Sequence, residues 1–230
     1  MSLFVIGDSH LSFGVEKPMD IFHGWSGYEK RLEENWRKIV NENDTVLICG
    51  DVSWGMKLNE ALEDFKFLHS LPGKKLLMKG NHDYWWETKA KMQRFLEENK
   101  IDSIDFLFNN AIRLGHICIA GTKGWFYDSG AEDEAKALNR ELCRLRLSLQ
   151  QAQKLGGEPV VFLHYPPIST RAVCSEIVDL LLEYGVKRCY YAHLHGPAIK
   201  NAFVSEYKGI QFYLISGDSL SFCPKLVEKI

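Results

Sequence analysis

Short apolar runs alternate with longer amphipathic segments over the first hundred residues. The runs Leu3–Ile6, Thr45–Cys49 and Lys75–Met78 have the length of buried strands. Between and after them, apolar side chains recur every three or four positions, as on one face of a helix. The three stripes are Tyr28, Leu32, Trp36 and Ile39 or Val40; Leu58, Ala61, Leu62, Phe65 and Leu68; and Met92, Phe95 and Leu96. The pattern predicts a β-α-β-α-β-α order, which is typical of a parallel α/β sheet.

The segment Leu11 to Gly27 is longer than an ordinary strand-to-helix connection, and we expect a loop there with exposed aromatic side chains at Phe13, Phe22 and Trp25. Ser26 is placed to cap the helix that follows.

The pattern changes to short strand-like runs after Ser103. Ile104–Phe108, Ala111–Leu114 and Ile117–Gly121 are separated by turn residues and predict antiparallel strands. The chain then predicts a loop at Lys123–Gly130, a helix at Ala131–Leu155, a strand at Val160–Leu163, a helix at Ala172–Tyr184 and a strand at Cys189–Ala192. Two further runs, Ile199–Val204 and Ile210–Ile215, predict a hairpin.

The expected helix at Ala131–Leu155 carries a stripe of Ala135, Leu138, Leu142, Leu145, Leu149 and Ala152. Such a stripe could form the seam of a homodimer. We favour a helix that covers the sheet, because one stripe of this length is what an amphipathic covering helix needs.

Composition narrows the class of protein. The 230 residues suit a single domain spanning 1–230, and the net charge of −2, with both signs mixed along the chain, gives no basic groove for a nucleic acid. No apolar run is long enough to cross a bilayer, and the six cysteines include no pair at metal-ligand spacing. With no basic leader before the first strand, we expect a cytoplasmic protein without a membrane partner.

Five apolar runs end in polar side chains that can bind metals. The residues that follow them are Asp8-Ser9-His10, Gly50-Asp51, Gly80-Asn81-His82-Asp83, His164 and His193-Leu194-His195. The carboxyl ends of parallel strands meet at one edge of a sheet, so these side chains are expected to converge.

The candidate ligands are Asp8, His10, Asp51, Asn81, His164, His193 and His195. Seven oxygen and nitrogen donors are too many for one tetrahedral zinc and suit two ions that share a bridging carboxylate. Imidazole with carboxylate and amide oxygen, and no thiolate, favours manganese, iron, zinc or cobalt. Two such ions suit in-line displacement at phosphorus by a metal-held hydroxide.

These blocks resemble, in type and order, those of the calcineurin-like metallophosphoesterases, and they span residues 8 to 195. The resemblance implies an α/β fold of two mixed β-sheets packed face to face with helices outside. It implies that Asp8, His10 and His195 hold one metal ion, that Asn81, His164 and His193 hold the other, and that Asp51 bridges them. His82 would contact the phosphate and protonate the leaving oxygen, with Asp83 orienting it.

The sequence departs from the family pattern at Trp54, where an aspartate is common, and at Ala192, where a glycine is common. Neither is an expected metal ligand. The phosphoprotein phosphatase branch usually has arginines after its second block and before its third, where this chain has Trp54, Gly55 and Lys79, which argues against a phosphoprotein substrate.

Four loop residues are candidates for substrate binding. Trp54 and Trp125 could stack an aromatic leaving group, although packed loop anchors are the commoner use of such rings. Lys123 and Arg171 could pair with a substrate phosphate, although loop charges are usually solvated.

The sequence therefore predicts a metal-dependent phosphohydrolase whose partner is a small-molecule phosphate ester, with a phosphodiester or nucleotide-type ester favoured over a monoester. The alternatives are a phosphomonoesterase or phosphoprotein phosphatase, and a metal-binding interaction scaffold without turnover. The scaffold is disfavoured because no ligand is degraded and because His82 and Asp83 are not needed for metal binding.

Overall fold

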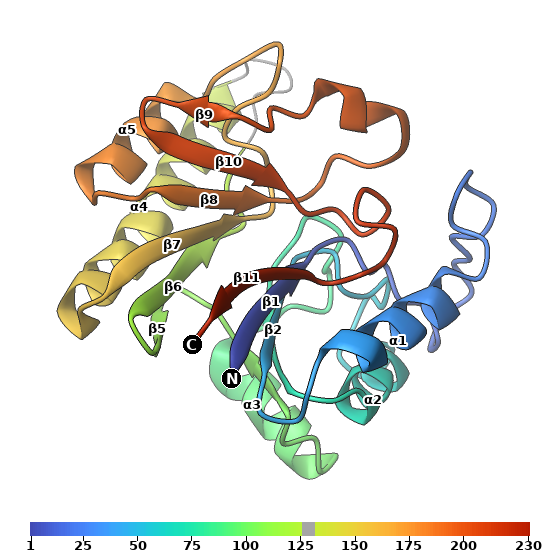
Figure 1. Cartoon of the computed structure of the whole chain (residues 1–230). Helices are drawn as coiled ribbons and strands as arrows, with labels where there is room; N and C mark the ends of the chain where they lie inside the picture. The colour runs from blue at the N-terminus through green and yellow to red at the C-terminus, as the bar shows by residue number, and fades with distance from the viewer. Residues whose placement is uncertain (126–131) are drawn as a thin grey trace. The chain divides into compact units, whose positions relative to one another are not determined.

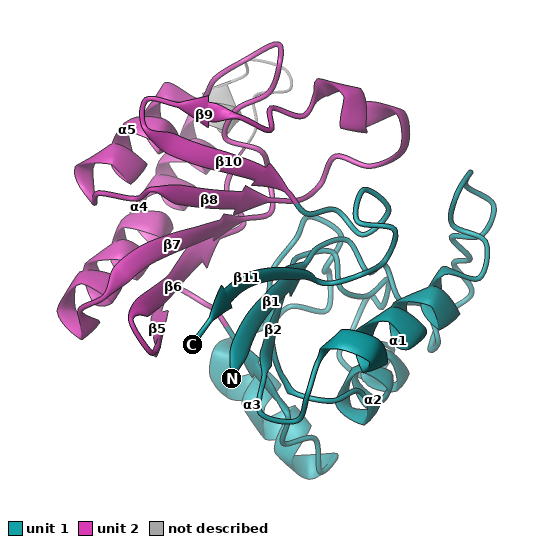
Figure 2. Cartoon of the chain, in the orientation of Figure 1, with its two compact units in different colours: residues 1–106, 215–230 teal, residues 107–214 magenta. Residues whose placement is uncertain are grey.

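The computed structural model describes residues 1–125 and 132–230, which form two compact units (Figure 2). Unit 1 comprises Met1–Phe106 and Ile215–Ile230, and unit 2 comprises Leu107–Leu214. Each unit contains one sheet. The single domain expected over 1–230 stays a prediction.

The sheet of unit 1 is mixed and has the order β11-β1-β2-β3-β4. Its strands are β1 (Ser2–Ile6), β2 (Thr45–Cys49), β3 (Lys74–Met78), β4 (Ile104–Phe106) and β11 (Lys225–Lys229). The first four are parallel, and β11 runs antiparallel to β1, so both ends of the chain lie on neighbouring strands (Figure 1).

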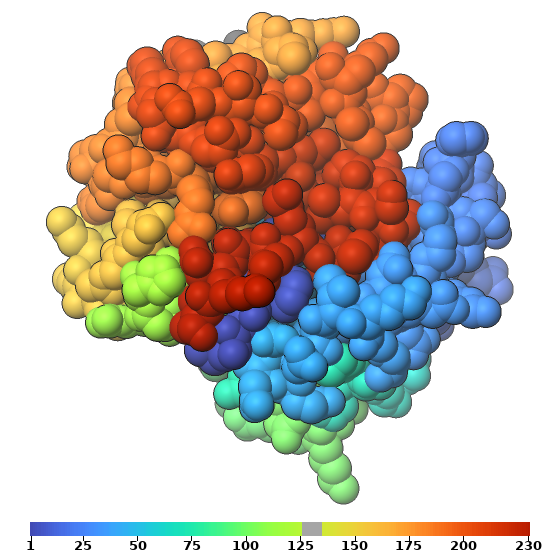
Figure 3. Space-filling view, in the orientation of Figure 1, coloured from blue at the N-terminus to red at the C-terminus, as the bar shows by residue number. Residues whose placement is uncertain are grey.

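One strand prediction fails in this sheet, and one strand was not predicted. The run Ile104–Phe108 was expected to pair antiparallel, but its first three residues form β4, parallel to β3. Strand β11 was not predicted, because Lys225-Leu-Val-Glu-Lys is short, charged and half-exposed, as suits an edge strand. Its residues lie at the surface beside those of β1 (Figure 3).

Helices α1 (Tyr28–Ile39), α2 (Leu62–Ser70) and α3 (Lys89–Glu98) belong to unit 1 (Figure 1) and carry most residues of the predicted stripes. Tyr28, Leu32 and Trp36 are fully buried. The cap of α1 is Gly27, at φ 58°, without a side-chain hydrogen bond, so the capping role expected of Ser26 is wrong. Helix α2 begins only at Leu62, and Leu58 and Ala61 are buried in the preceding turn.

The loop before α1 projects from unit 1 (Figure 1) and carries exposed apolar side chains. Phe13, Ile21 and Phe22 are exposed, as the sequence suggested for the two phenylalanines. Trp25 is only 2% exposed, which contradicts the expectation for it. Its ring packs edge-on against Tyr28 and Phe222, and so anchors the loop to the core.

The sheet of unit 2 is also mixed, with the order β5-β6-β7-β8-β10-β9. Its strands are β5 (Ala111–Leu114), β6 (Ile117–Thr122), β7 (Glu158–Leu163), β8 (Arg188–Tyr191), β9 (Glu206–Tyr207) and β10 (Ile210–Leu214). The antiparallel β5–β6 pair is as predicted. The strand expected at Ile199–Val204 is wrong, because this stretch enters a 3-10 helix, η1 (Gly196–Asn201), with Pro197 in its first turn. The antiparallel partner of β10 is instead β9.

Helices α4 (Glu132–Leu155) and α5 (Ser175–Glu183) pack together in unit 2, and α4 also contacts β5, β6 and β7. Leu138, Leu145 and Leu149 of α4 are buried in the apolar core of the unit, whereas Ala135 is exposed, so the buried stripe starts later than predicted. The interpretation of this helix as a cover for the sheet is confirmed. Most of the loop expected at Lys123–Gly130 lies outside the described residues.

The predicted α/β class, with two mixed sheets and helices around them, is confirmed. All six cysteines are free thiols. No helix in residues 1–125 and 132–230 combines the length and the apolar character that crossing a membrane requires.

Candidate metal centre

The loops that follow β1, β2 and β3 bring most of the candidate residues of unit 1 to one edge of its sheet. Asp8 and His10 follow β1, Asp51 follows β2, and Asn81 to Asp83 follow β3. The side chains of Asp8, His10 and Asp51 are at most 1% exposed. Burying two carboxylates is costly unless a cation or hydrogen bonds compensate for their lost hydration.

The backbone of these loops adopts a conformation that is unfavourable for side chains other than glycine. Asp8, His10 and Asp51 have φ angles of 53°, 42° and 51°, in the left-handed region. The two loops fix each other by main-chain bonds, since Asp8 N–H donates to Gly50 O (3.0 Å) and His10 N–H donates to Asp51 O (2.9 Å). Strain held in this way often marks functional positions.

The donor atoms of the first two loops lie close together. One ligand atom of Asp8 and one of His10 lie within 4.8 Å of each other. His10 Nε2 is 3.8 Å from Asp51 Oδ2. The Tyr28 hydroxyl donates to the main-chain oxygen of His10 at 2.7 Å and ties this ligand loop to α1.

Gly80 leaves the space that the Asp51 carboxylate occupies. A Cβ atom on residue 80 would lie 2.1 Å from Asp51 Oδ1 and 2.2 Å from Asp51 N. The same oxygen accepts the His82 main-chain N–H at 2.8 Å. Gly80 therefore allows the loops after β2 and β3 to approach each other closely.

Asp83 clamps these loops with its carboxylate, which is fully buried. Each of its oxygens accepts from at least two N–H groups. The donors are Asp51 N (2.8 Å) and Gly80 N (2.7 Å) to Oδ2, and Val52 N (2.8 Å), Ser53 N (3.3 Å) and Trp85 Nε1 (3.0 Å) to Oδ1. Among the described residues none of these bonds goes to the His82 ring, which Asp83 was expected to orient.

Two opposing influences act on the charge of Asp83. Burial raises the pKa of this carboxyl and the charge of Asp51 raises it further, whereas the N–H groups of Gly80, Val52 and Ser53 lower it. Because all five partners are donors, the hydrogen-bond geometry serves the ionised form.

The His82 ring is held by aromatic contacts. Its centroid lies 4.6 Å from that of Trp54 and 5.8 Å from that of His10. Trp54 stacks on His10, with centroids 4.9 Å apart and planes 19° apart, and the Lys17 ammonium lies 5.2 Å from the Trp54 centroid. Trp54 therefore packs against two candidate histidines, which the sequence did not indicate.

A buried hydrogen-bond chain supports the same loops from behind. Ser53 Oγ donates to Asp64 Oδ2 in a short bond, and Phe13 N–H donates to Asp64 Oδ1 at 2.7 Å. Asp64 is fully buried on α2, and burial raises its pKa to about 6. These hydrogen bonds join the loop after β1 to the loop after β2.

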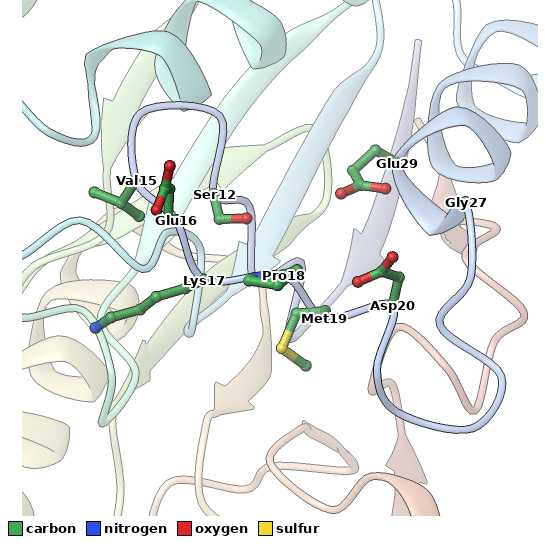
Figure 4. A pocket seen from close by; sticks show the side chains of 9 residues that line it. All are labelled: Ser12, Val15, Glu16, Lys17, Pro18, Met19, Asp20, Gly27 and Glu29. Atoms are coloured by element: carbon green, nitrogen blue, oxygen red, sulfur yellow. The ribbon is translucent and has the colours of Figure 1, made fainter.

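A pocket of about 710 Å³ lies between the loop before α1 and the start of that helix (Figure 4). Glu16, Asp20 and Glu29 line it, with Lys17 as the one basic residue of the lining. Three carboxylates against one ammonium disfavour a phosphoryl group in this pocket.

Unit 2 positions its histidines at the ends of β7 and β8. His164 follows β7 and is fully buried, and His193 and His195, both half-buried, follow β8. One ring nitrogen of His164 and one of His193 lie within 4.8 Å of each other. His193 has a φ angle of 71°, so this ligand position also has a left-handed backbone.

Aromatic side chains surround these histidines. The Tyr165 ring lies 4.5 Å from the His193 ring, and the Lys123 ammonium lies 5.2 Å from the Trp125 centroid and 5.6 Å from the Tyr165 centroid. Lys123 and Trp125 therefore lie next to Tyr165, which itself contacts the candidate ligand His193. Their role in substrate binding stays a prediction. Arg171 is exposed, and among the described residues its guanidinium makes no hydrogen bond or ion pair.

The donor set within each unit fits a divalent or trivalent metal ion. Unit 1 offers buried carboxylates, an imidazole and an amide, and unit 2 offers imidazoles. Oxygen with imidazole nitrogen, and no thiolate among the candidates, suits manganese, iron, zinc or cobalt.

Sequence reasoning missed Tyr165 and Asp64. Tyr165 directly follows a predicted ligand, which could have marked it as a neighbour of the site. Asp64 lies on a helix face among apolar residues, and a buried aspartate there could have been found as a polar break in the stripe.

Known proteins resemble this chain in family and in fold. Residues 1–197 match the model of a family described as calcineurin-like phosphoesterase. No curated protein matches the chain. Among solved structures, a protein of unknown function from Aquifex aeolicus has 15% identity and a TM-score of 0.56, and the match covers 98% of this chain and 95% of that one.

Two further structures have similar folds. The phosphopantetheinyl hydrolase of Mycobacterium tuberculosis has 15% identity and a TM-score of 0.59, with 100% of this chain and 96% of that chain covered. A protein of Thermus thermophilus has 13% identity and a TM-score of 0.50, with 84% and 81% covered. At such identities the likeness concerns the fold.

Proposed function

Because the chain belongs to the calcineurin-like phosphoesterase family, we propose that it hydrolyses a phosphodiester or nucleotide-type phosphate ester in a reaction that depends on two metal ions. The observation that carries the proposal is the strained backbone at predicted ligands. Asp8, His10, Asp51 and His193 all have positive φ angles. Such strain persists where the surrounding structure enforces it, and it is common at functional sites.

The ligand assignment follows the motifs of the family. Asp8, His10 and His195 would hold one ion, Asn81, His164 and His193 would hold the other, and Asp51 would bridge them. When bound, the two ions supply an activated water and offset the charge of the phosphoryl group. Manganese, iron, zinc and cobalt all suit these donors.

His82 is the proposed general acid. Its main-chain N–H is fixed by Asp51, and its ring packs against Trp54. These contacts would hold an imidazole proton in place for the departing oxygen. Asp83 contributes as a positioning residue, since it clamps the loops that carry Asp51 and His82.

A diester or nucleotide-type substrate is favoured because each unit has a half-buried tryptophan near its candidate histidines, in direct ring contact in unit 1 and by way of Tyr165 in unit 2. Trp54 packs on His82, and Trp125 lies beneath the Lys123 ammonium. Such rings can stack a base or another planar leaving group, and the ammonium can pair with a phosphoryl oxygen. The name of the Mycobacterium tuberculosis neighbour, a phosphopantetheinyl hydrolase, is compatible with a hydrolase on this fold.

The experiment compares hydrolysis of bis(p-nitrophenyl) phosphate and p-nitrophenyl phosphate by the manganese-loaded protein. We expect a higher kcat/KM for the diester than for the monoester. In Asp51→Asn we expect kcat/KM to fall by at least about 100-fold, because replacing a bridging ligand should reduce activity no less than replacing a residue that only hydrogen-bonds to a ligand. Asp102→Asn is the matched control, since that side chain is 95% exposed. Faster monoester cleavage would contradict the substrate class, and a metal-loaded protein inert toward both esters would favour the scaffold without turnover.

A further inference from the structure

Tyr165 is the residue at which the ring contacts of unit 2 meet. Its centroid lies 4.5 Å from that of His193, 5.4 Å from that of His164 and 6.0 Å from that of Trp125. The Lys123 ammonium lies 5.6 Å from the same ring. A single half-buried side chain therefore contacts two candidate metal ligands, a candidate phosphate-binding cation and a candidate stacking ring.

A main-chain hydrogen bond fixes the backbone of Tyr165 independently of the contacts that its ring makes. The residue follows β7 by way of His164, and its N–H donates to Lys123 O at 2.8 Å. This bond joins the segments that follow β6 and β7. The base of the side chain is thus held by two parallel strands that pair along their whole length.

His193 depends on its neighbours for its ring orientation. Its backbone is left-handed, and its main-chain surroundings are fixed by the bonds Ala192 N–H to His164 O (3.1 Å) and Leu194 N–H to Ala192 O (2.8 Å). These bonds leave the χ angles of the imidazole undetermined. The rings of His164 and Tyr165 flank it, with centroids 5.1 Å and 4.5 Å away.

Lys123 is oriented by the same ring. Its ammonium lies near the faces of both Trp125 and Tyr165, a cation–π arrangement that limits the sweep of a flexible four-carbon stem. Removing the Tyr165 ring would take away one of these two faces. It would also take away a ring that flanks His193.

We infer that Tyr165 is a positioning residue that holds the His193 imidazole and the Lys123 ammonium in a fixed relation to each other. Through His193 it sets the orientation of a metal ligand, and through Lys123 it sets the place of the cation that meets the phosphoryl oxygens. The roles assigned to metal and phosphate rest on the proposed function. The orientation of the two side chains does not.

Three variants separate this role from general packing. Tyr165→Phe keeps the ring, and Tyr165→Leu removes it. Tyr207→Leu is the matched control, because Tyr207 is a half-buried tyrosine of unit 2 with the Lys208 ammonium 5.7 Å from its ring. Tyr207 lies on β9, and among the described residues its ring contacts include no histidine.

The first readout uses the metal-free protein and needs no activity. NMR relaxation of the histidine ring carbons reports how tightly each imidazole is held. We expect His193 to become more mobile in Tyr165→Leu and to stay as in the wild type in Tyr165→Phe and Tyr207→Leu. Equal mobility of His193 in all four proteins would overturn the inference, whatever the metal results.

The second readout is Co²⁺ binding, followed by the absorption spectrum of the bound ion. We expect about a tenfold weaker affinity and an altered spectrum for one ion in Tyr165→Leu, and values within about twofold of the wild type in the other two variants. Unchanged affinity and spectrum in Tyr165→Leu would overturn the link to the metal ligand. A wild type that binds no Co²⁺ would instead contradict the proposed function, and the relaxation measurement would still decide the role of Tyr165.

Discussion

Both units join their ligand loops by main-chain hydrogen bonds and place aromatic rings beside their histidines, but in unit 1 a buried carboxylate also clamps two of these loops. In unit 1, main-chain hydrogen bonds join the loop carrying Asp8 and His10 to the loop carrying Asp51, and the Asp83 carboxylate joins the Asp51 loop to the loop after β3. In unit 2, the imidazole of His193 is flanked by rings, chiefly that of Tyr165. Hydrogen bonds to a buried charge are strong and directional, whereas ring contacts are individually weak and adjustable.

This difference predicts how each unit responds to change. A substitution that removes a buried charge in unit 1 leaves several donors without an acceptor, so the whole edge of the sheet should loosen. Replacing the Tyr165 ring in unit 2 leaves the His164 ring in contact with His193. Unit 1 should therefore fail cooperatively, and unit 2 should lose ligand orientation in steps.

The largest effect is expected for Asp83→Asn. The amide has nearly the shape of the carboxylate, but its NH₂ group would face N–H donors of Gly80 and Asp51 or of Val52 and Trp85. Several buried donors would lose their acceptor, so we expect the free energy of unfolding to fall by roughly 3 kcal/mol or more. Urea unfolding at pH 7.5 measures it.

The control for this substitution is Asp102→Asn in the same unit, which should change stability by less than about 0.5 kcal/mol. A similar small change in Asp83→Asn would mean that the clamp does not hold unit 1 together. The contrast between the units would then be lost.

We expect a smaller effect on the free energy of unfolding from the ionisation of Asp64 in unit 1. Burial raises the pKa of Asp64 from 3.8 to about 6, and the charge of Glu63 adds to this, while bonds from Ser53 and Phe13 oppose it. The folded state therefore binds the proton more tightly than the unfolded state, so this group stabilises the fold as pH falls from about 6 toward 3.8 and loses that contribution as pH rises.

Asp64→Asn cannot gain this proton. The stability of the wild type relative to the variant should rise by about 2 kcal/mol between pH 7.5 and pH 4.5. Paired urea titrations at the two pH values measure the difference. A stability difference that is independent of pH would show that Asp64 does not carry the shifted ionisation.

The order of elements and the candidate ligands could be predicted because both leave local signals. Buried strands such as Thr45–Cys49 read as apolar runs, and each ends at a polar block. Strand β11 could not be predicted, since its partner β1 is more than 200 residues away and its own pattern is half-polar. Trp25 was misjudged because a loop position does not reveal that its ring meets Phe222.

The contacts that support the candidate ligands could not be predicted from the sequence either. The motif suggested that Asp83 orients His82, but the direction of a side chain after a tight turn depends on which main-chain N–H groups the neighbouring loop presents. The contact of Trp54 with His10 and that of Tyr165 with His193 likewise arise from loop conformations that no periodicity encodes.

We propose that the chain holds two metal ions, with Asp8 among the ligands of one and His193 among the ligands of the other. The metal content of manganese-loaded wild type, Asp8→Asn and His193→Asn, measured by mass spectrometry after gel filtration with Asp102→Asn as the control, tests this proposal. We expect about two ions per chain in the wild type and the control, and about one in each ligand variant. A wild type that retains no metal, or ligand variants that both retain two ions, would contradict it.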